Sequence, residues 1–343
     1  MSLLTILFSL LGCSGRAWTD CEPNEFEAWA EKPEVAVVDV RTADEYAAGH
    51  LPWASNVDWY LKDFLGRIES AYPKGASIAV YCRSGRRSAE AAAVLSKAGY
   101  QVCNLKGGYL AWTDAGKPTS AYAVETFFTR SGHPVAVSLI KHGTLALKYM
   151  GNTVHVDPVG AYGKRTDYAA EFPKADVILV THEHADHFDR EAIDALMDKG
   201  RTLLVTNSRC EGMLGFGTAM ANGDAMDILG DVRLEAVPAY NYTDGRTKFH
   251  PKGRDNGFIL TMDGFRVYIA GDTEDIPEMA ELKAIDVAFL PVNQPYTMTV
   301  EQCVHAAQTI RPVVLIPYHF SDTDLGALPG LLPGIDVRLR DMR

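Results

Sequence analysis

Residues 177–187 read VILVTHEHADH, an apolar, β-branched run followed at once by three histidines and an aspartate. The run predicts a buried strand, and the polar residues stand where that strand would end. His182, His184 and Asp186 alternate, so they share one side of an extended backbone, and His187 follows at the bend. Neutral imidazoles and carboxylates are the usual ligands of zinc and iron. The stretch therefore predicts a metal site at the carboxyl end of a strand.

The sequence on either side of this motif predicts more strands. From about residue 124, VAVSLIKHG and TLALKYMG follow one another with glycine between them, as antiparallel strands do. Further on, Asp272 follows the apolar run FRVYIAG and His319 follows VVLIPY. Active sites of α/β proteins form where the ends of neighbouring strands meet at one edge of a sheet. We therefore expect Asp272 and His319 to join the histidine motif.

The first part of the chain alternates strand and helix patterns, which predicts a three-layer α/β domain. Its expected elements are strands at 35–40 and 77–82, a helix at 86–98 and a strand at 101–105. The total length of 343 residues favours two domains, and DAGKPTSAYA (114–123) has the composition of a linker. The predicted divisions are an apolar N-terminal segment (1–18), a first domain (19–117), a linker (118–123) and a second domain (124–343).

Composition limits the partners of the protein. The net charge of −11 and the absence of a dense Lys/Arg stripe argue against a nucleic-acid surface, so we expect small-molecule substrates. No apolar run is long enough for a membrane-spanning helix. Leu10–Cys13 resembles a lipoprotein cleavage site, but the positively charged start of a signal peptide is missing. We predict a cytoplasmic protein, with a lipoprotein anchored through Cys13 as the alternative.

A second reactive motif follows the expected strand at 77–82. A cysteine before a glycine-containing loop and a helix start has a lowered pKa, because the loop N–H groups and the helix N-terminus favour the thiolate. A free thiolate suits a reducing compartment. Arginines in the loop add positive charge that can hold an anionic substrate. The motif consists of Cys82, Arg83, Ser84, Gly85, Arg86, Arg87 and Ser88.

This first domain resembles the rhodanese family. DVRTADEYAAGHLPWASN (39–56) and LKGGYLAW (105–112) carry that family's opening and closing signatures. The resemblance implies that Cys82 carries a persulfide, exchanged with a sulfur donor and an acceptor thiol, and that Arg87 shapes the loop. The spacing Cys-x4-Arg favours sulfur transfer over the phosphate chemistry of related Cys-x5-Arg phosphatases. One departure is Trp53, where the family commonly has glycine.

The second domain resembles the metallo-β-lactamase superfamily, which implies an αββα sandwich. By this resemblance His182 and His184 bind a first metal, while Asp186, His187 and His319 bind a second, with Asp272 bridging. Asp186 is also assigned to catalysis. Two zinc ions are the expected cofactor, with one iron as the alternative. The pair would acidify a water molecule and polarise the scissile bond.

One ligand stays open at this stage. A histidine is common in this branch where the chain has Asn241, and His250 is the tentative substitute from the following loop. His142 and His155 lie beside expected strands and are interpreted as supporting or core residues.

These motifs predict a bifunctional enzyme. A cysteine-persulfide sulfurtransferase site would be joined to a metal-dependent hydrolase acting on an ester, lactone, thioester or phosphoester. One alternative is an iron-dependent persulfide dioxygenase with a fused sulfurtransferase. Another is a non-catalytic module that binds sulfur or metal.

Overall fold

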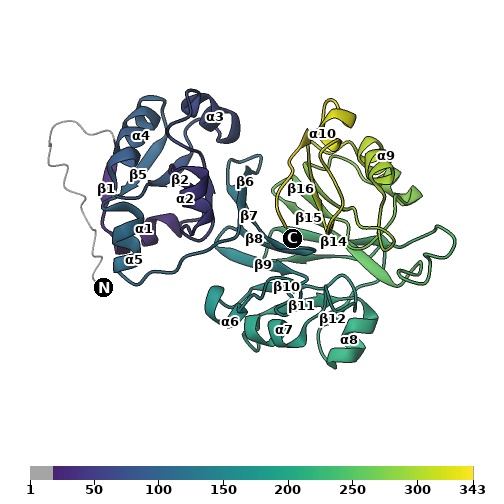
Figure 1. Cartoon of the computed structure of the whole chain (residues 1–343). Coiled ribbons are helices and arrows are strands. Elements are labelled where there is room, and N and C mark those ends of the chain that lie inside the picture. Colours follow the sequence, from purple (N-terminus) through teal and green to yellow (C-terminus); the bar gives the residue numbers. More distant parts are fainter. Residues whose placement is uncertain (1–17, 343) are drawn as a thin grey trace.

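The computed structural model describes residues 18–342 and divides them into two lobes (Figure 1). The N-terminal lobe is built on one five-stranded sheet in which all paired strands are parallel. In spatial order its strands are β1 (Thr19–Cys21), β5 (Gln101–Leu105), β4 (Ser77–Tyr81), β2 (Val35–Asp39) and β3 (Ala54–Asn56). Its helices are α1 (Pro23–Ala30), α2 (Ala43–Ala47), α3 (Phe64–Ala71), α4 (Arg86–Lys97) and α5 (Gly108–Asp114).

Two hydrophobic clusters give this lobe its three layers. Phe26 of α1 and Trp112 of α5 pack on one face of the sheet, whereas Ile68 of α3 and Leu95 of α4 pack on the other. Each strand of the sheet centre is buried on both faces, which explains the continuous apolar runs in the sequence. The predicted three-layer α/β domain with a parallel sheet is confirmed.

The C-terminal lobe is a sandwich of two seven-stranded sheets. The first sheet, in spatial order, contains β12 (Thr218–Ala219), β11 (Leu203–Thr206), β10 (Val177–Leu179), β9 (Asn152–Val156), β8 (Thr144–Tyr149), β7 (Pro134–Lys141) and β6 (Val124–Phe128). The second contains β13 (Ala225–Ile228), β14 (Val232–Ala239), β15 (Asp255–Met262), β16 (Phe265–Ile269), β17 (Val287–Pro291), β18 (Val314–Tyr318) and β19 (Asp336–Val337). Strands β6 to β9 are antiparallel, as the glycine-separated runs predicted.

Helices cover the outer faces of both sheets, so the predicted αββα sandwich is confirmed (Figure 1). The elements outside the first sheet are α6 (Tyr168–Glu171), α7 (Arg190–Leu196) and α8 (Ser208–Leu214). Those associated with the second sheet are the 3₁₀ helix η1 (Pro277–Glu281), α9 (Val300–Ile310) and α10 (Leu328–Leu331). Alternation along β7 sends Val135 and Val137 into the core between the sheets, while Ala136 and Ser138 face outward.

The two lobes are in direct contact. Phe128 of β6 packs on Tyr72 of the N-terminal lobe, with ring centroids 5.4 Å apart. Ser120, in the segment expected to be a linker (118–123), pairs with His50 through two backbone hydrogen bonds of 2.8 and 2.7 Å. The connection therefore lies against the N-terminal lobe.

The cysteines differ from the sequence expectation in one respect. Cys21, which carries no motif, and Cys103, which the sequence places in the core of a short strand, form a disulfide between β1 and β5. Disulfides are rare in reducing compartments, so this bond does not fit the compartment inferred from a free thiolate. The cytoplasmic location stays a prediction, and Cys13 lies outside the described residues. Within residues 18–342, no helix has the length and apolar character needed to cross a bilayer.

Candidate functional site

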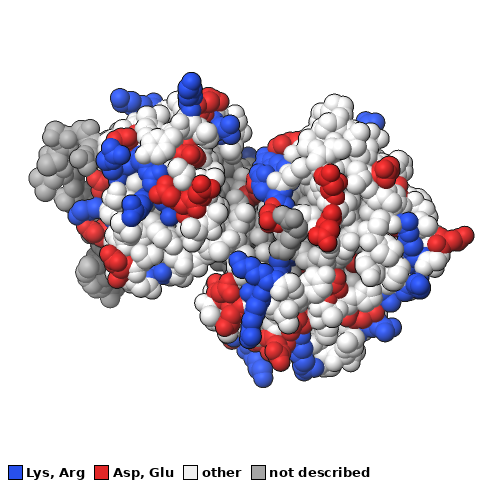
Figure 2. Space-filling model, viewed as in Figure 1, with Lys and Arg blue, Asp and Glu red and all other residues white. Residues whose placement is uncertain are grey.

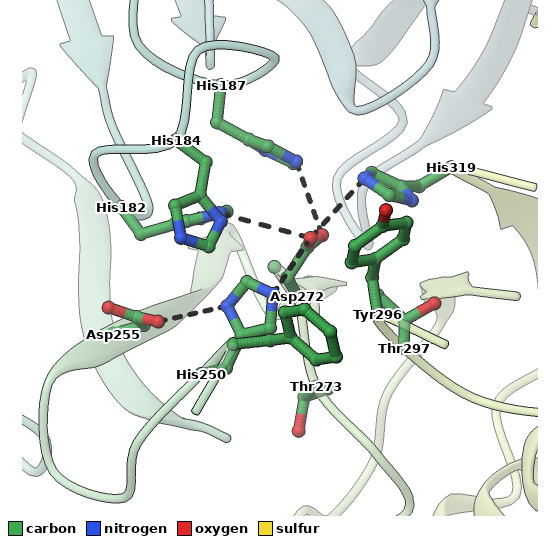
Figure 3. Close-up of polar contacts among 12 residues, drawn as sticks. His182, His184, His187, His250, Asp255, Asp272, Thr273, Tyr296, Thr297 and His319 are labelled. Carbon is green, nitrogen blue, oxygen red and sulfur yellow. Dashed lines mark hydrogen bonds and ion pairs between the residues drawn. The ribbon is translucent and has the colours of Figure 1, made fainter. Parts of the chain in front are cut away.

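The histidine motif occupies the loop that follows β10. Thr181, directly before His182, is fixed by two 2.7 Å hydrogen bonds to the carboxylate of Asp157. This anchors the start of the loop, from which His182, His184 and His187 project toward Asp272 (Figure 3). The predicted position at the carboxyl end of a strand is what the structure has.

The second sheet supplies the other side of the site. Asp272 comes three residues after the end of β16, and His319 follows directly after β18. His250 comes from the loop between β14 and β15. The three side chains point toward the histidine motif of the first sheet (Figure 3). The site therefore forms where strand ends from both sheets meet.

Two groups of four residues have the geometry of metal-ligand sets, with potential ligand atoms within 4.8 Å of one another in each group. The first group is His182, His184, His250 and Asp272. The second is His142, Asp186, His187 and His319. In this arrangement His250 lies in the first group, while the Asn241 amide donates to the carbonyl oxygen of Tyr296 at 2.7 Å.

Asp272 lies between the two groups. One carboxylate oxygen, Oδ2, is 3.3 Å from His250 Nε2 and 3.3 Å from His319 Nε2, and the other, Oδ1, is 3.3 Å from His187 Nε2. His182 Nε2 is 3.9 Å from Oδ2. This central position, with contacts to both groups, is the one required of a bridging carboxylate (Figure 3).

His142 was not singled out as a ligand by the sequence, yet it lies in the second group. Its Nε2 is 3.2 Å from Asp186 Oδ2, and its ring stacks at a tilt on His319 with centroids 3.7 Å apart. The signal available in the sequence was its place at the end of β7, beside the glycine turn. His155, by contrast, is fully buried against Tyr168 and Phe172, which agrees with a core role.

Buried carboxylates orient two of the histidines. Asp157 accepts a hydrogen bond from His187 Nδ1 at 2.7 Å, and Asp255 accepts one from His250 Nδ1 at 3.1 Å. Each bond directs the remaining nitrogen, Nε2, toward Asp272. Such carboxylate–histidine pairs fix the tautomer and the ring orientation of metal ligands. The sequence had assigned no role to either aspartate, because neither is part of a spaced histidine motif.

Electrostatics at the site favour the neutral form of three histidines and the ionised form of Asp272. Burial lowers the pKa of His182, and neighbouring His187 lowers it further, so this ring stays neutral. Burial also lowers the pKa of His184 and of His142. For Asp272, burial acts to raise the pKa, but the surrounding histidines outweigh it and hold the carboxyl ionised. For His187, burial acts to lower the pKa, but the carboxylates of Asp272 and Asp157 outweigh it and raise that pKa. Neutral imidazole and ionised carboxylate are the metal-binding forms.

The site also contains buried polar atoms that no described residue satisfies. His187 Nε2, His250 Nε2, His319 Nε2 and Asp272 Oδ1 have no hydrogen-bond partner among residues 18–342. Leaving such atoms unpaired is costly unless they bind an ion or another ligand. In addition His142 and His319 both have φ of 46°, a strained conformation for these residues that is typical of functional sites. The donor set therefore fits metal ions.

The thiol motif occupies the loop between β4 and α4. Cys82 is buried, and the Ser88 hydroxyl donates to its sulfur at 3.4 Å. Gly85, with φ of 86°, forms the left-handed turn that starts α4 and brings the chain back over the cysteine. The loop residues Arg83, Ser84 and Arg86 are exposed to solvent.

Arg87 differs from the other arginines of the loop. Its guanidinium makes two 2.7 Å hydrogen bonds to the carboxylate of Glu45 and is buried. The pair ties α4 to α2, so Arg87 supports the loop rather than offering a free cation. The geometry agrees with the loop-shaping role that the rhodanese resemblance implied.

Comparison with known proteins assigns both lobes to families. Residues 136–319 match a family described as the β-lactamase superfamily domain, and residues 22–115 match the rhodanese-like domain. A UPF0173 metal-dependent hydrolase of Geobacillus sp. (strain WCH70) is 31% identical over 189 residues, covering 52% of this chain and 83% of that protein. A UPF0173 metal-dependent hydrolase of Archaeoglobus fulgidus is 31% identical, covering 49% of this chain and 76% of that protein.

Solved structures agree with these matches. A Parabacteroides distasonis protein described as a metal-dependent hydrolase is 51% identical, with a TM-score of 0.62, covering 65% of this chain and 100% of that chain. Igni18, described as a metallo hydrolase of Ignicoccus hospitalis, is 26% identical, with a TM-score of 0.50, covering 61% of this chain and 95% of that chain. The chain therefore belongs to the β-lactamase superfamily, among the UPF0173 metal-dependent hydrolases, and carries a rhodanese-like domain ahead of that domain.

Proposed function

We propose that residues 124–343 form a binuclear metallohydrolase that cleaves an ester, lactone, thioester or phosphoester. The observation that carries this proposal is the position of Asp272 between two groups of potential ligands whose buried nitrogen atoms lack other partners. When bound, two zinc ions would supply the Lewis acidity that activates water and polarises the scissile bond.

Residues of the chain would orient the metal ligands and contact the substrate. Asp157 and Asp255 hold His187 and His250 in the orientation that the ions need. Asp186 is half-buried, so it offers a carboxylate at the side from which substrate can approach. The exposed ring of Tyr162 lies 4.7 Å from the ring of His142 and can contact an apolar part of the substrate.

The decisive experiment combines metal analysis with a substrate panel. The protein is purified without chelator or affinity nickel, and its metals are measured by plasma mass spectrometry. About two zinc ions per chain, with hydrolysis of at least one of the four substrate classes, is the expected result. A single iron per chain, with oxygen consumption in the presence of a persulfide, would replace the hydrolase with a dioxygenase.

We propose further that residues 19–117 transfer sulfur through a persulfide on Cys82. A free, buried cysteine sits at the turn into α4, where backbone N–H groups of the loop and of the helix start can hold the outer sulfur of a persulfide. Arg83 and Arg86 are exposed beside it and can attract an anionic sulfur donor such as thiosulfate. The acceptor would be a small thiol.

A further inference from the structure

A cavity of about 660 Å³ lies between the two lobes and is lined by neither Cys82 nor any of the potential metal ligands. Residues of α1, of the turn before β3 and of α5 form one side, and residues of β7, β8, β9 and α6 form the other. The volume is in the range of pockets that bind small organic molecules, and domain interfaces are a common place for them.

The walls of the cavity are aromatic and its sheet side is polar. Phe26, Trp53, Trp112 and Phe172 contribute rings. The first sheet contributes Ser138, Lys148 and Thr153, which lie on the outward face of β7, β8 and β9. If the cavity bound nothing, aliphatic side chains could fill it, as they fill the core on the inward face of the same strands.

Trp53 is held in a strained conformation at this cavity. Its φ is 63°, in the left-handed region that favours glycine, and it stands at the position where the rhodanese pattern commonly has glycine. Strain of this kind persists where the surroundings or a function require it. Here it places a large indole in the cavity wall.

Lys148 is a second residue at the cavity whose position costs folding free energy. Its ammonium makes no hydrogen bond and no ion pair with any residue from 18 to 342, although the side chain is half-buried. Burial lowers the pKa of Lys148, and the exposed Glu31 opposes this only in part. The other carboxylates at the cavity are engaged elsewhere, Glu27 with Lys117 and Glu171 with the Tyr122 hydroxyl. Among residues 18–342, Lys148 thus has the charge of Glu31 nearby but no hydrogen-bonded or ion-paired partner.

We propose that this cavity binds a small organic monoanion, with its carboxylate or sulfonate on Lys148 and a flat apolar body between the aromatic rings. A single negative charge is specified because three glutamates line the same cavity and would repel a polyanion. The site is independent of the hydrolase and sulfurtransferase proposals, since it shares no residue with either.

The test uses two fluorescent probes of nearly the same shape on the full-length, metal-loaded chain. 8-Anilinonaphthalene-1-sulfonate carries one sulfonate, and N-phenyl-1-naphthylamine is its neutral counterpart. Lys148→Met should weaken sulfonate binding at least tenfold and leave the neutral probe unchanged. Lys97→Met, an exposed position on α4 outside the cavity, is the matched control and should change neither. Ala170→Trp, which places a ring in the cavity from α6, should weaken both probes.

The thermal midpoint separates binding from folding. Lys148→Met should melt at or above the temperature of the wild type, because an unpaired, half-buried charge is removed. If Lys148→Met binds the sulfonate as tightly as the wild type, or loses both probes equally, the assignment of the anion to Lys148 is wrong. If Ala170→Trp leaves both probes unaffected, they bind elsewhere and the proposal fails.

Discussion

His250 is the single side chain that completes the first ligand group. It is fully buried, its Nδ1 is held by Asp255, and its Nε2 is 3.3 Å from Asp272. His250→Ala should therefore reduce the metal content from about two ions per chain to about one, and lower hydrolysis at least tenfold. Plasma mass spectrometry of the purified variant gives the stoichiometry directly.

Asn241 provides the control for that experiment. It lies on the same stretch of chain, and its backbone N–H bonds to the carbonyl of His250, but its side chain faces Tyr296. Asn241→Ala should keep both ions. A variant Asn241→Ala that lost one ion while His250→Ala kept two would reverse the assignment.

Cys82→Ser tests the thiol site at the same scale. Thiosulfate would transfer its outer sulfur to the Cys82 thiolate and release sulfite, and the persulfide would then convert cyanide to thiocyanate. Serine cannot form the persulfide, so thiocyanate production should vanish while hydrolysis is unchanged. Cys210→Ser, at a free and buried cysteine of the other lobe, should retain the sulfur transfer. If Cys82→Ser still produced thiocyanate, another residue would be the nucleophile.

At the scale of residues, the sequence predicted ligands that share a spaced motif or follow an apolar strand. His182, His184, Asp186 and His187 are adjacent in the chain, so their proximity required no tertiary information. His142, Asp157 and Asp255 reach the site only through the packing of distant strands, so their local sequence did not assign them a place in it. His250 lies in a loop whose path depends on both sheets.

At the scale of elements, the glycine at the start of α5 lies in close contact with the thiol loop. A Cβ on Gly108 would lie 2.3 Å from the Cys82 carbonyl oxygen and 2.7 Å from the Gly85 nitrogen, and φ is 62°. Gly108→Ala should destabilise the protein by about 3 kcal/mol and disrupt sulfur transfer. Gly116→Ala has nearly the same φ, 67°, and open space, so it should cost about 1 kcal/mol. If urea unfolding showed that the two variants lose the same free energy of unfolding, the close contact at Gly108 would be contradicted.

The Arg87–Glu45 pair makes the contact between α4 and α2 sensitive to pH. Hydrogen bonds from Arg87 lower the pKa of Glu45 from 4.5 to about 2, so the pair stabilises the folded state fully above pH 4.5. This contribution is lost as pH falls toward 2. Glu45→Gln should cost about 1–2 kcal/mol at pH 7, and its difference from the wild type in urea unfolding should shrink below pH 4.5. A difference independent of pH would exclude the ion pair as its source.

The elements predicted for the N-terminal lobe match the structure to within one residue, whereas α1 and α3 were not predicted. The expected strands 35–40 and 77–82 correspond to β2 and β4, and the expected helix 86–98 to α4. These elements could be predicted because their apolar runs and helix-forming residues determine the local structure. Short elements such as β12, β19 and α6 could not be predicted, because two to four residues carry no periodicity and depend on the neighbours they pair with.

At the scale of the whole molecule, bound metal should determine thermal stability. The ligands come from both sheets, and without ions the buried nitrogens of the site keep no other partner among the described residues. Removal of metal with dipicolinate should lower the thermal midpoint by roughly 5–10 °C, and added zinc should restore it. Calorimetry measures both, and an unchanged midpoint would mean that the site is not loaded in the folded protein.

The arrangement of the two lobes could not be predicted from the sequence. Charged residues of both signs are mixed over the visible face (Figure 2). The contact depends on single side chains such as Phe128 and Ser120, which a sequence pattern does not distinguish from others. The cavity between the lobes results from this packing, so it could not be predicted from the sequence either.

The division of the ligands between two sheets also constrains the order of assembly. His182 and His184 belong to the first sheet, while His250, Asp272 and His319 belong to the second. A partly folded chain with only one sheet in place holds no complete ligand group. We therefore expect metal to bind tightly only once the sandwich has closed, although the first sheet alone supplies His142, Asp186 and His187 of the second group. Bound ions would slow the unfolding of the sandwich and leave the rate of folding unchanged.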